Sequence, residues 1–169
     1  MSKPFVAILM GSDSDLPTMK STLDILKLLE IGYEVRITSA HRTPEMTHDY
    51  VVDAEKRGCA VFICAAGLAA HLAGAVSAIT VRPVIGVPID CGPLKGQDAL
   101  LSTVMMPGGI PVATVAIGSA GAKNSAYLAA QIIATNDEAL AQHLRDERAT
   151  NAKTIEEKNS KVQQELGLA

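Results

Sequence analysis

Short apolar runs that end at a glycine or a polar loop, with helix-like segments between them, constrain the fold of this chain most. Residues Phe5–Met10 are all apolar, and the run stops at Gly11. Such a continuous run is typical of a strand buried on both faces, because a half-exposed strand alternates apolar and polar side chains. Further strands are predicted at 33–38, 60–65, 84–87 and 112–117.

Helical segments separate these predicted strands. Asp15 followed by Leu16 and Pro17 indicates a helix start, since proline is tolerated in the first turn, and Gly32 is expected to end this helix. Thr43 is predicted to cap a second helix that runs to Arg57. Others are predicted at 68–79, 98–104 and 122–135. Alternating strands and helices predict an α/β fold, a three-layer flavodoxin-like or Rossmann-like parallel sheet with helices on both faces.

The 169 residues suffice for one domain with a sizeable core, so a single α/β domain over 1–169 is predicted, its core at about 5–136. The chain is 48% hydrophobic but has two Phe, three Tyr and no Trp. A scarcity of aromatic side chains disfavours proteins that stack the bases of single-stranded nucleic acid. The net charge of −3 provides no basic surface for duplexes either, so no nucleic-acid partner is expected.

Two uncharged runs, 59–81 and 99–122, are each long enough to span a bilayer. Buried strands and helices explain both, and the Pro107–Pro111 turn would leave backbone groups unsatisfied in lipid. The N-terminus lacks a signal-peptide pattern, and Cys59, Cys64 and Cys91 lack the spacing of metal ligands. We therefore expect no membrane contact, a cytoplasmic location and cysteines that act as small buried hydrophobes.

Residues 137–166 differ from the rest, with 12 charged residues in 30. Their sparse apolar positions have spacings compatible with one helical stripe. These are Leu140, Leu144, Ile155, Val162 and Leu166. A C-terminal helical arm is predicted, which is either a solvated helix or an arm that packs on a neighbouring subunit.

Polar residues concentrate in three loops after predicted strands, where ligands bind in open parallel sheets. In the first loop, 11–15, the serine hydroxyls and the N–H groups of the next helix suit a phosphate. Its aspartates would repel a phosphate, so at least one is expected to hold sugar hydroxyls. Serine and aspartate also simply cap helices, and that alternative stays open.

The second loop, 39–44, sets His41 beside Arg42. Arginine offers a planar fork for phosphate, and histidine is the commonest side chain for moving protons near neutral pH. The third loop, 65–74, has small residues that let a ligand approach the backbone, with His71 one turn into the predicted helix. A surface His–Arg pair and a hydrogen-bonded core His71 are the alternatives. The loops carry no catalytic triad and no metal-ligand cluster, which predicts a metal-free site for a small phosphorylated, sugar-bearing ligand.

These loops resemble a known family in order and spacing. Gly11–Asp15, Ser39–Pro44 and Ala69–Leu72, with Met106–Val112 later, are similar to the N5-carboxyaminoimidazole ribonucleotide mutases of bacterial purine biosynthesis (the PurE family, bacterial mutase branch). The resemblance covers about residues 5–136. It implies an isomerase that moves a carboxylate from the exocyclic nitrogen of the substrate to the adjacent ring carbon, giving 4-carboxy-5-aminoimidazole ribonucleotide, with no ATP, metal or organic cofactor. It also implies a homo-octamer with sites completed by neighbouring subunits.

The resemblance also implies roles for individual residues. His41 matches the general acid/base, and Asp15 matches the residue that binds the ribose hydroxyls. Three further groups of positions match substrate contacts. Ser12, Ser14, Ser39 and Arg42 match the phosphate end; Ala40 matches a further substrate-binding position; and Gly67, His71 and Leu72 match the loop around the carboxylate and base.

The chain departs from the family pattern at three positions: Leu68 replaces a glycine, Ala73 a proline and Met105 a common glutamine. Leu68 adds bulk and helical preference where a flexible backbone is usual. Other functions remain as alternatives: a direct carboxylase of aminoimidazole ribonucleotide, or a nucleotide sensor without catalysis. A flavin electron carrier is disfavoured by loops without aromatic residues, and a phosphorylation receiver by the absence of an aspartate after the third strand.

Overall fold

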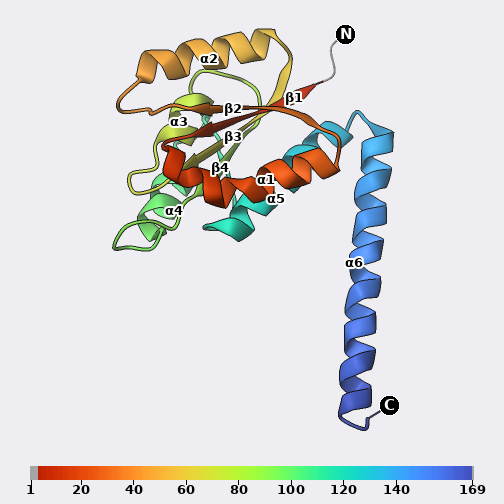
Figure 1. Cartoon of the computed structure of the whole chain (residues 1–169). Coiled ribbons are helices and arrows are strands. Elements are labelled where there is room, and N and C mark those ends of the chain that lie inside the picture. The colour runs from red at the N-terminus through yellow and green to blue at the C-terminus, as the bar shows by residue number, and fades with distance from the viewer. Residues whose placement is uncertain (1–3, 169) are drawn as a thin grey trace. The chain divides into compact units, whose positions relative to one another are not determined.

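The computed structural model describes residues 4–168, which divide into two compact units, one up to Ile133 and one from Ala134. The first unit is built on a five-stranded, all-parallel sheet in the order β2-β1-β3-β4-β5 (Figure 1). The parallel sheet confirms the α/β fold predicted from the alternation of strands and helices, and its strand order is the flavodoxin-like one. The strands are β1 (Phe5–Met10), β2 (Gly32–Ile37), β3 (Cys59–Ala66), β4 (Val84–Pro88) and β5 (Ala113–Thr114).

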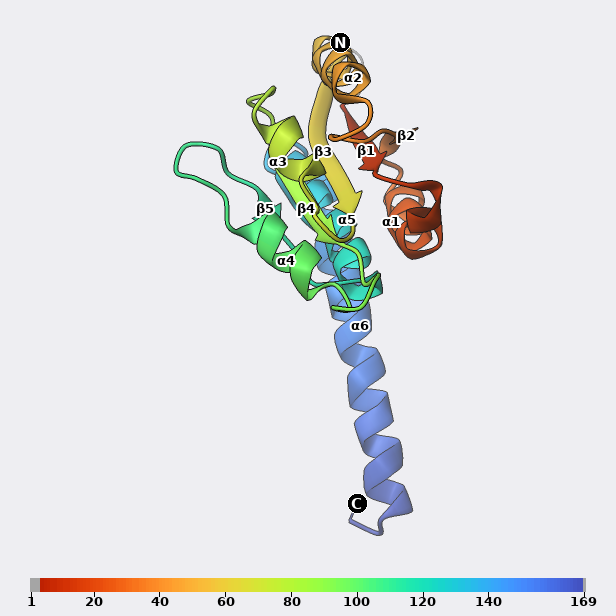
Figure 2. The same cartoon turned by 90° about the vertical axis from the view of Figure 1, so that its left-hand side faces the viewer.

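Helices cover both faces of this sheet. In Figure 2, α2, α3 and α4 lie on one side of the strands and α1 and α5 on the other. The helices are α1 (Leu16–Leu28), α2 (Pro44–Lys56), α3 (Leu72–Ser77), α4 (Gln97–Val104), α5 (Ser119–Ala134) and α6 (Glu138–Glu165), with a short 3-10 helix η1 (Asp13–Asp15) before α1. The hydroxyl of Thr22 in α1 donates to the carbonyl of Ala122 in α5 at 2.7 Å, which joins the two helices on their shared face.

The apolar runs form the core as predicted, because their side chains alternate between two covered faces. Ala7 and Leu9 of β1 join Phe62 of β3 in a cluster that also includes buried residues of α2 and α3. Burial raises the pKa of the Cys59 thiol to about 11, and it also raises that of Cys64. Both thiols therefore stay protonated near neutral pH and pack as small apolar groups, as expected.

The predicted helix over 68–79 is wrong at its start, since α3 has only the six residues Leu72–Ser77. Leu68 has φ +55°, a left-handed conformation that no α-helix accommodates. The N–H of Ala70 is bonded to Ser102 in α4 instead of to a helical carbonyl. Contacts from α4 therefore override the helical preference of the Leu-Ala-Ala segment, and His71 precedes α3 rather than lying one turn inside it.

Other details also differ from prediction, among them two boundaries and one capping bond. Helix α1 ends at Leu28, with Glu30 at φ +55°, so Gly32 begins β2 instead of ending the helix. Strand β5 is much shorter than predicted because it pairs with β4 at only Ile85 and Gly86. The side chain of Thr43 makes no cap bond to α2 and instead accepts a hydrogen bond from the N–H of Ser39 at 2.9 Å.

The second unit contains α6, which confirms a C-terminal helix. Asp137 caps it by accepting a hydrogen bond from the N–H of Leu140 at 3.1 Å. Of the predicted stripe, Leu140 and Leu144 are buried, whereas Ile155, Val162 and Leu166 are exposed. Within residues 4–168, no helix combines the length and apolarity needed to cross a bilayer.

Candidate active site

The three polar loops meet at the carboxyl edge of the sheet, around a cavity of about 580 Å³. They come together because β1, β2 and β3 are adjacent and parallel, so their carboxyl ends share one edge. All ten predicted site residues line this cavity. It is lined by Gly11, Ser12, Ser14, Asp15, Ser39, Ala40, His41, Arg42, Ala66, Gly67, Leu68, Ala69, His71, Leu72 and Cys91.

The loop after β1 is held by a capping box. Ser12 caps η1 by accepting a hydrogen bond from the N–H of Ser14 at 3.3 Å, and its own N–H donates to Oδ2 of Asp15 at 3.1 Å. Capping, one of the two interpretations of this loop, is therefore realised. Both serines nevertheless line the cavity, and the Oγ atoms of Ser12 and Ser14 lie 2.9 Å apart.

Asp15 is the buried carboxyl of the site, only 6% exposed. This burial raises its pKa above the usual 3.8, although hydrogen bonds from the backbone of Ser12 and Gly11 act in the opposite direction. A carboxylate that is costly to bury gains from donors that a ligand supplies, and sugar hydroxyls are such donors.

The loop after β2 links to the loop after β1 through Arg42. Its backbone N–H donates to the hydroxyl of Ser39 at 3.2 Å, and its Nη2 donates to the carbonyl of Gly11 at 3.4 Å. The guanidinium is exposed and lines the cavity beside the two serines. A cation, hydroxyls and backbone N–H groups at one end of a cavity form a suitable set of donors for a phosphate.

His41 and His71 are in direct contact, although thirty residues separate them in the chain. Nε2 of His41 lies 2.8 Å from Nδ1 of His71, and the rings meet edge to face with centroids 4.9 Å apart. The two nitrogens share one hydrogen bond, so one ring donates and the other accepts. Both side chains are exposed to the cavity, which rules out the alternative that His71 is a buried core residue.

Cys91 is a lining residue that the sequence prediction missed. The prediction of a small buried hydrophobe is wrong for it, since it is half-buried and lines the cavity. Its Sγ lies 2.1 Å from the point where a Cβ on Gly67 would stand, so a larger residue at position 67 would require this thiol to move. Its position just after the buried strand β4 is the sequence signal that could have found it.

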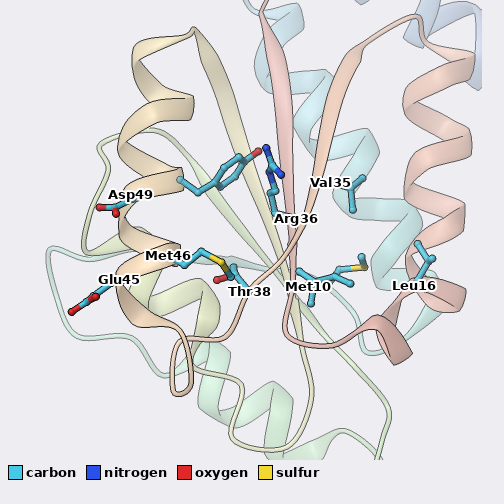
Figure 3. Close-up of a pocket in the computed structure, with 10 residues that line it drawn as sticks. Met10, Leu16, Val35, Arg36, Thr38, Glu45, Met46 and Asp49 are labelled. Atoms are coloured by element: carbon cyan, nitrogen blue, oxygen red, sulfur yellow. The ribbon is translucent and has the colours of Figure 1, made fainter.

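A second, larger cavity of about 770 Å³ lies beside strand β2 (Figure 3). Met10, Val35 and Leu16 project into the space between α1 and α2, whereas Glu45 and Asp49 point away from it. The guanidinium of Arg36 is already engaged, because it stacks over the Tyr50 ring at 5.2 Å. This cavity has neither a proton-transfer pair nor a free anion-binding group, so the chemistry belongs to the cavity with the two histidines.

Across residues 4–168, no three His, Cys, Asp or Glu side chains are grouped in a way that could hold a metal ion. The cavity is lined by an imidazole pair, by a guanidinium and hydroxyls that suit a phosphate, and by the buried carboxyl of Asp15. The fold and this site define an α/β protein of the flavodoxin-like class with a cavity suited to a phosphorylated, sugar-bearing ligand and to proton transfer.

Comparisons with known proteins agree with this class. Residues 5–154 match the family described as AIR carboxylase. The N5-carboxyaminoimidazole ribonucleotide mutase of Bacillus subtilis is 49% identical over 160 residues, covering 95% of this chain and 99% of that protein. The mutase of the same name from Escherichia coli K12 is 50% identical over 143 residues, covering 85% of each. The crystal structure of Treponema denticola PurE superposes with a TM-score of 0.86 at 33% identity, covering 94% of this chain and 98% of that one.

The chain belongs to the AIR carboxylase family of enzymes. The resemblance found in the sequence loops is thereby confirmed, as is the flavodoxin-like parallel sheet.

Proposed function

We propose that this protein is a mutase that converts N5-carboxyaminoimidazole ribonucleotide to 4-carboxy-5-aminoimidazole ribonucleotide in purine biosynthesis. The contact between His41 and His71 inside a cavity with phosphate donors carries the proposal. Relatives of about 50% identity over most of the chain bear the name of this activity, which supports the same assignment.

The substrate's phosphate binds at the end of the cavity formed by the first two loops. Ser12, Ser14 and Ser39 supply hydroxyls there, and Arg42 supplies a charged fork that is already oriented by its bond to Gly11. Asp15 accepts hydrogen bonds from the ribose hydroxyls. Ala40, Gly67 and Leu72 form close walls around the base, where small or apolar side chains leave room for a flat ring.

His41 is the general acid/base. It protonates the exocyclic nitrogen as the carbamate C–N bond breaks, releasing carbon dioxide and leaving aminoimidazole ribonucleotide in the cavity. The ring carbon then attacks carbon dioxide, forming the new C–C bond, and His41 takes the proton that this carbon loses. His41 donates one proton and later regains one, and the carboxyl group returns to the same molecule, so the reaction is a net isomerisation that needs no ATP. His71 orients the imidazole through the shared hydrogen bond.

Two features of the site favour retention of carbon dioxide between the two steps. The walls nearest the histidines are small or apolar, from Ala66 and Ala69 to the half-buried Cys91. They offer no nucleophilic amine to compete for carbon dioxide. Holding both fragments in one cavity gives the second step the advantage of a high effective concentration.

The proposal includes assembly and location. We infer a homo-octamer in the cytoplasm, in which neighbouring subunits complete the sites and α6 is an arm between subunits. The exposed apolar side chains of Ile155, Val162 and Leu166 on α6 support an arm that packs on another chain, since an isolated solvated helix gains nothing from them.

The test compares two substrates on the purified protein. N5-carboxyaminoimidazole ribonucleotide is supplied without ATP or bicarbonate, and aminoimidazole ribonucleotide is supplied separately with bicarbonate, while product absorbance is followed. We expect rapid turnover of the first substrate. Turnover of aminoimidazole ribonucleotide alone would identify the protein as a direct carboxylase. Turnover of neither substrate would identify it as a protein that binds nucleotides without catalysis.

A further inference from the structure

We propose that Ser102 of α4 is a positioning residue for the histidine pair, acting through the backbone of Ala70. This inference rests on the proposed function for its kinetic test, although its structural test does not. Ser102 is outside the cavity lining, and none of the three loops contains it.

The hydroxyl of Ser102 is placed to connect α4 to the loop that carries His71. It accepts a hydrogen bond from the N–H of Ala70 at 3.0 Å and donates its single proton to the carbonyl of Asp98 at 2.7 Å. A serine hydroxyl has one proton and two lone pairs, so it can accept from Ala70 while it donates to a carbonyl. Two other carbonyls lie within its reach, at 3.2 and 3.4 Å, and that of Asp98 is the nearest. The donation to Asp98, one turn earlier in α4, fixes the hydroxyl's direction and leaves its lone pairs toward Ala70.

The next residue of α4 contacts the other backbone polar group of Ala70, its carbonyl. The hydroxyl of Thr103 donates to the carbonyl of Ala99 at 2.7 Å and lies 3.4 Å from the carbonyl of Ala70. Consecutive residues of α4 therefore contact both the N–H and the C=O of Ala70, which is 2% exposed. An N–H in such a place has no access to water that could replace a lost partner.

Helix α4 is a rigid support for these bonds because it packs closely on β4. A Cβ on Gly86 would stand 2.4 Å from Cγ2 of Thr103, so α4 approaches this strand at a distance that only glycine permits. The position of Ser102 is thereby fixed relative to the sheet. The sheet also fixes the start of the loop that carries His41, which follows β2.

The backbone just before His71 is irregular, so a bond from another element helps to hold it. Leu68 has a left-handed backbone, which is unfavourable for a residue other than glycine. Helix α3, which follows His71, has only six residues. The bond from Ala70 to Ser102 lies one residue before His71, so its loss is transmitted to the 2.8 Å contact between the two rings.

Kinetics of Ser102→Ala, Ser102→Cys and Ser102→Thr provide the first test. Cysteine fills the serine's space but accepts hydrogen bonds weakly, whereas threonine keeps the hydroxyl. We expect the alanine and cysteine variants to lose kcat by about tenfold or more, because small misplacement of a catalytic group is costly. KM is expected to stay near the wild-type value, and threonine to restore most of kcat. Ser21→Ala is the matched control, since Ser21 makes a similar bond to its own helix, to Thr18.

The second test reads the histidine pair without substrate. Solid-state NMR of protein labelled with ¹⁵N at histidine reports which ring nitrogens carry protons and share a hydrogen bond, with His41→Asn and His71→Asn used for assignment. We expect the His41 and His71 signals to change in Ser102→Ala and in Ser102→Cys but not in Ser21→Ala. The cysteine variant decides the outcome if the alanine variant does not fold.

The outcomes separate this inference from the proposed function. Unchanged kcat and unchanged ring signals in the Ser102 variants would overturn the positioning role, as would an equal loss in Ser21→Ala. Changed ring signals in a protein that shows no mutase turnover at all would support the positioning role and overturn the proposed function instead.

Discussion

Replacing Gly67 with alanine tests the packing of the cavity wall against Cys91. A Cβ at position 67 would stand 2.1 Å from the Cys91 Sγ, whereas uncompressed carbon contacts are about 3.5–4.0 Å. The next nearest atoms, Cβ and the carbonyl oxygen of Ile89, are both at an ordinary 3.6 Å. The clash therefore comes from one side chain, and the backbone at Gly67 is not left-handed, so the thiol alone opposes alanine at this position.

The expected cost follows from the required displacement. The thiol must move by more than 1 Å, and overpacking of this kind costs about 1–3 kcal/mol. For a chain of this size each kcal/mol corresponds to roughly 2–4 °C in Tm. Gly67→Ala should therefore lower Tm by about 2–12 °C, and it should reduce turnover because His71 lies on the same loop.

The assay is a double-mutant cycle of thermal and urea unfolding at one fixed protein concentration, since subunit association also affects stability. Cys91→Ala removes the clashing sulfur, so the double variant should recover most of the stability lost in Gly67→Ala. Gly108→Ala is the control, because a Cβ there meets no atom within 4 Å. A Gly67→Ala protein as stable as the wild type, or a double variant in which the two losses simply add, would refute this account of the wall.

The remaining predictions concern the acid/base, the buried carboxyl and the arm. His41→Asn should lower kcat by about 10²–10⁴-fold in kinetic assays while calorimetry shows that ligand affinity is retained. The control is His48→Asn, because His48 is exposed and outside the cavity lining. A rate near that of the wild type in His41→Asn would contradict the acid/base role. The pKa of Asp15 is raised in the folded state, so between its unfolded-state and folded-state pKa values the folded protein binds more protons than the unfolded chain. The free energy of unfolding, relative to that of Asp15→Asn, should therefore fall as pH rises from below 3.8 and then level off. Urea titrations that show the opposite slope would refute this prediction. Truncation after Asp137 should reduce the mass of the assembly in light scattering, and an unchanged mass rejects the arm between subunits.

The sheet and the meeting of the three loops were predictable from the sequence because they depend on simple physics. Continuous apolar runs such as Phe5–Met10 require cover on both faces, and alternation with helices requires parallel pairing. Parallel strands place every loop that follows a strand at one edge. The loops that carry His41 and His71 were therefore expected at the same edge, whereas a direct contact between the two rings was not predicted.

Other features depend on contacts between distant segments, which local patterns do not report. The Leu-Ala-Ala segment before His71 has strong helical preference, yet Ser102, more than thirty residues away, bonds the N–H of Ala70 and α3 begins only at Leu72. The 2.8 Å bond between the histidine rings depends on this local geometry as well. Cys91 was missed because a lone cysteine has no motif, and only its position after a strand indicated the site.

The central claim is that the carboxyl group moves within one cavity, and its most direct test follows that group. Substrate labelled with ¹³C at the carboxyl carbon is converted without ATP in buffer that contains unlabelled bicarbonate, and the product is analysed by mass spectrometry. The account predicts product that keeps the ¹³C enrichment of the substrate. Product whose carboxyl carbon matches the unlabelled bicarbonate would contradict it, because carbon dioxide would then leave the cavity before the new bond forms.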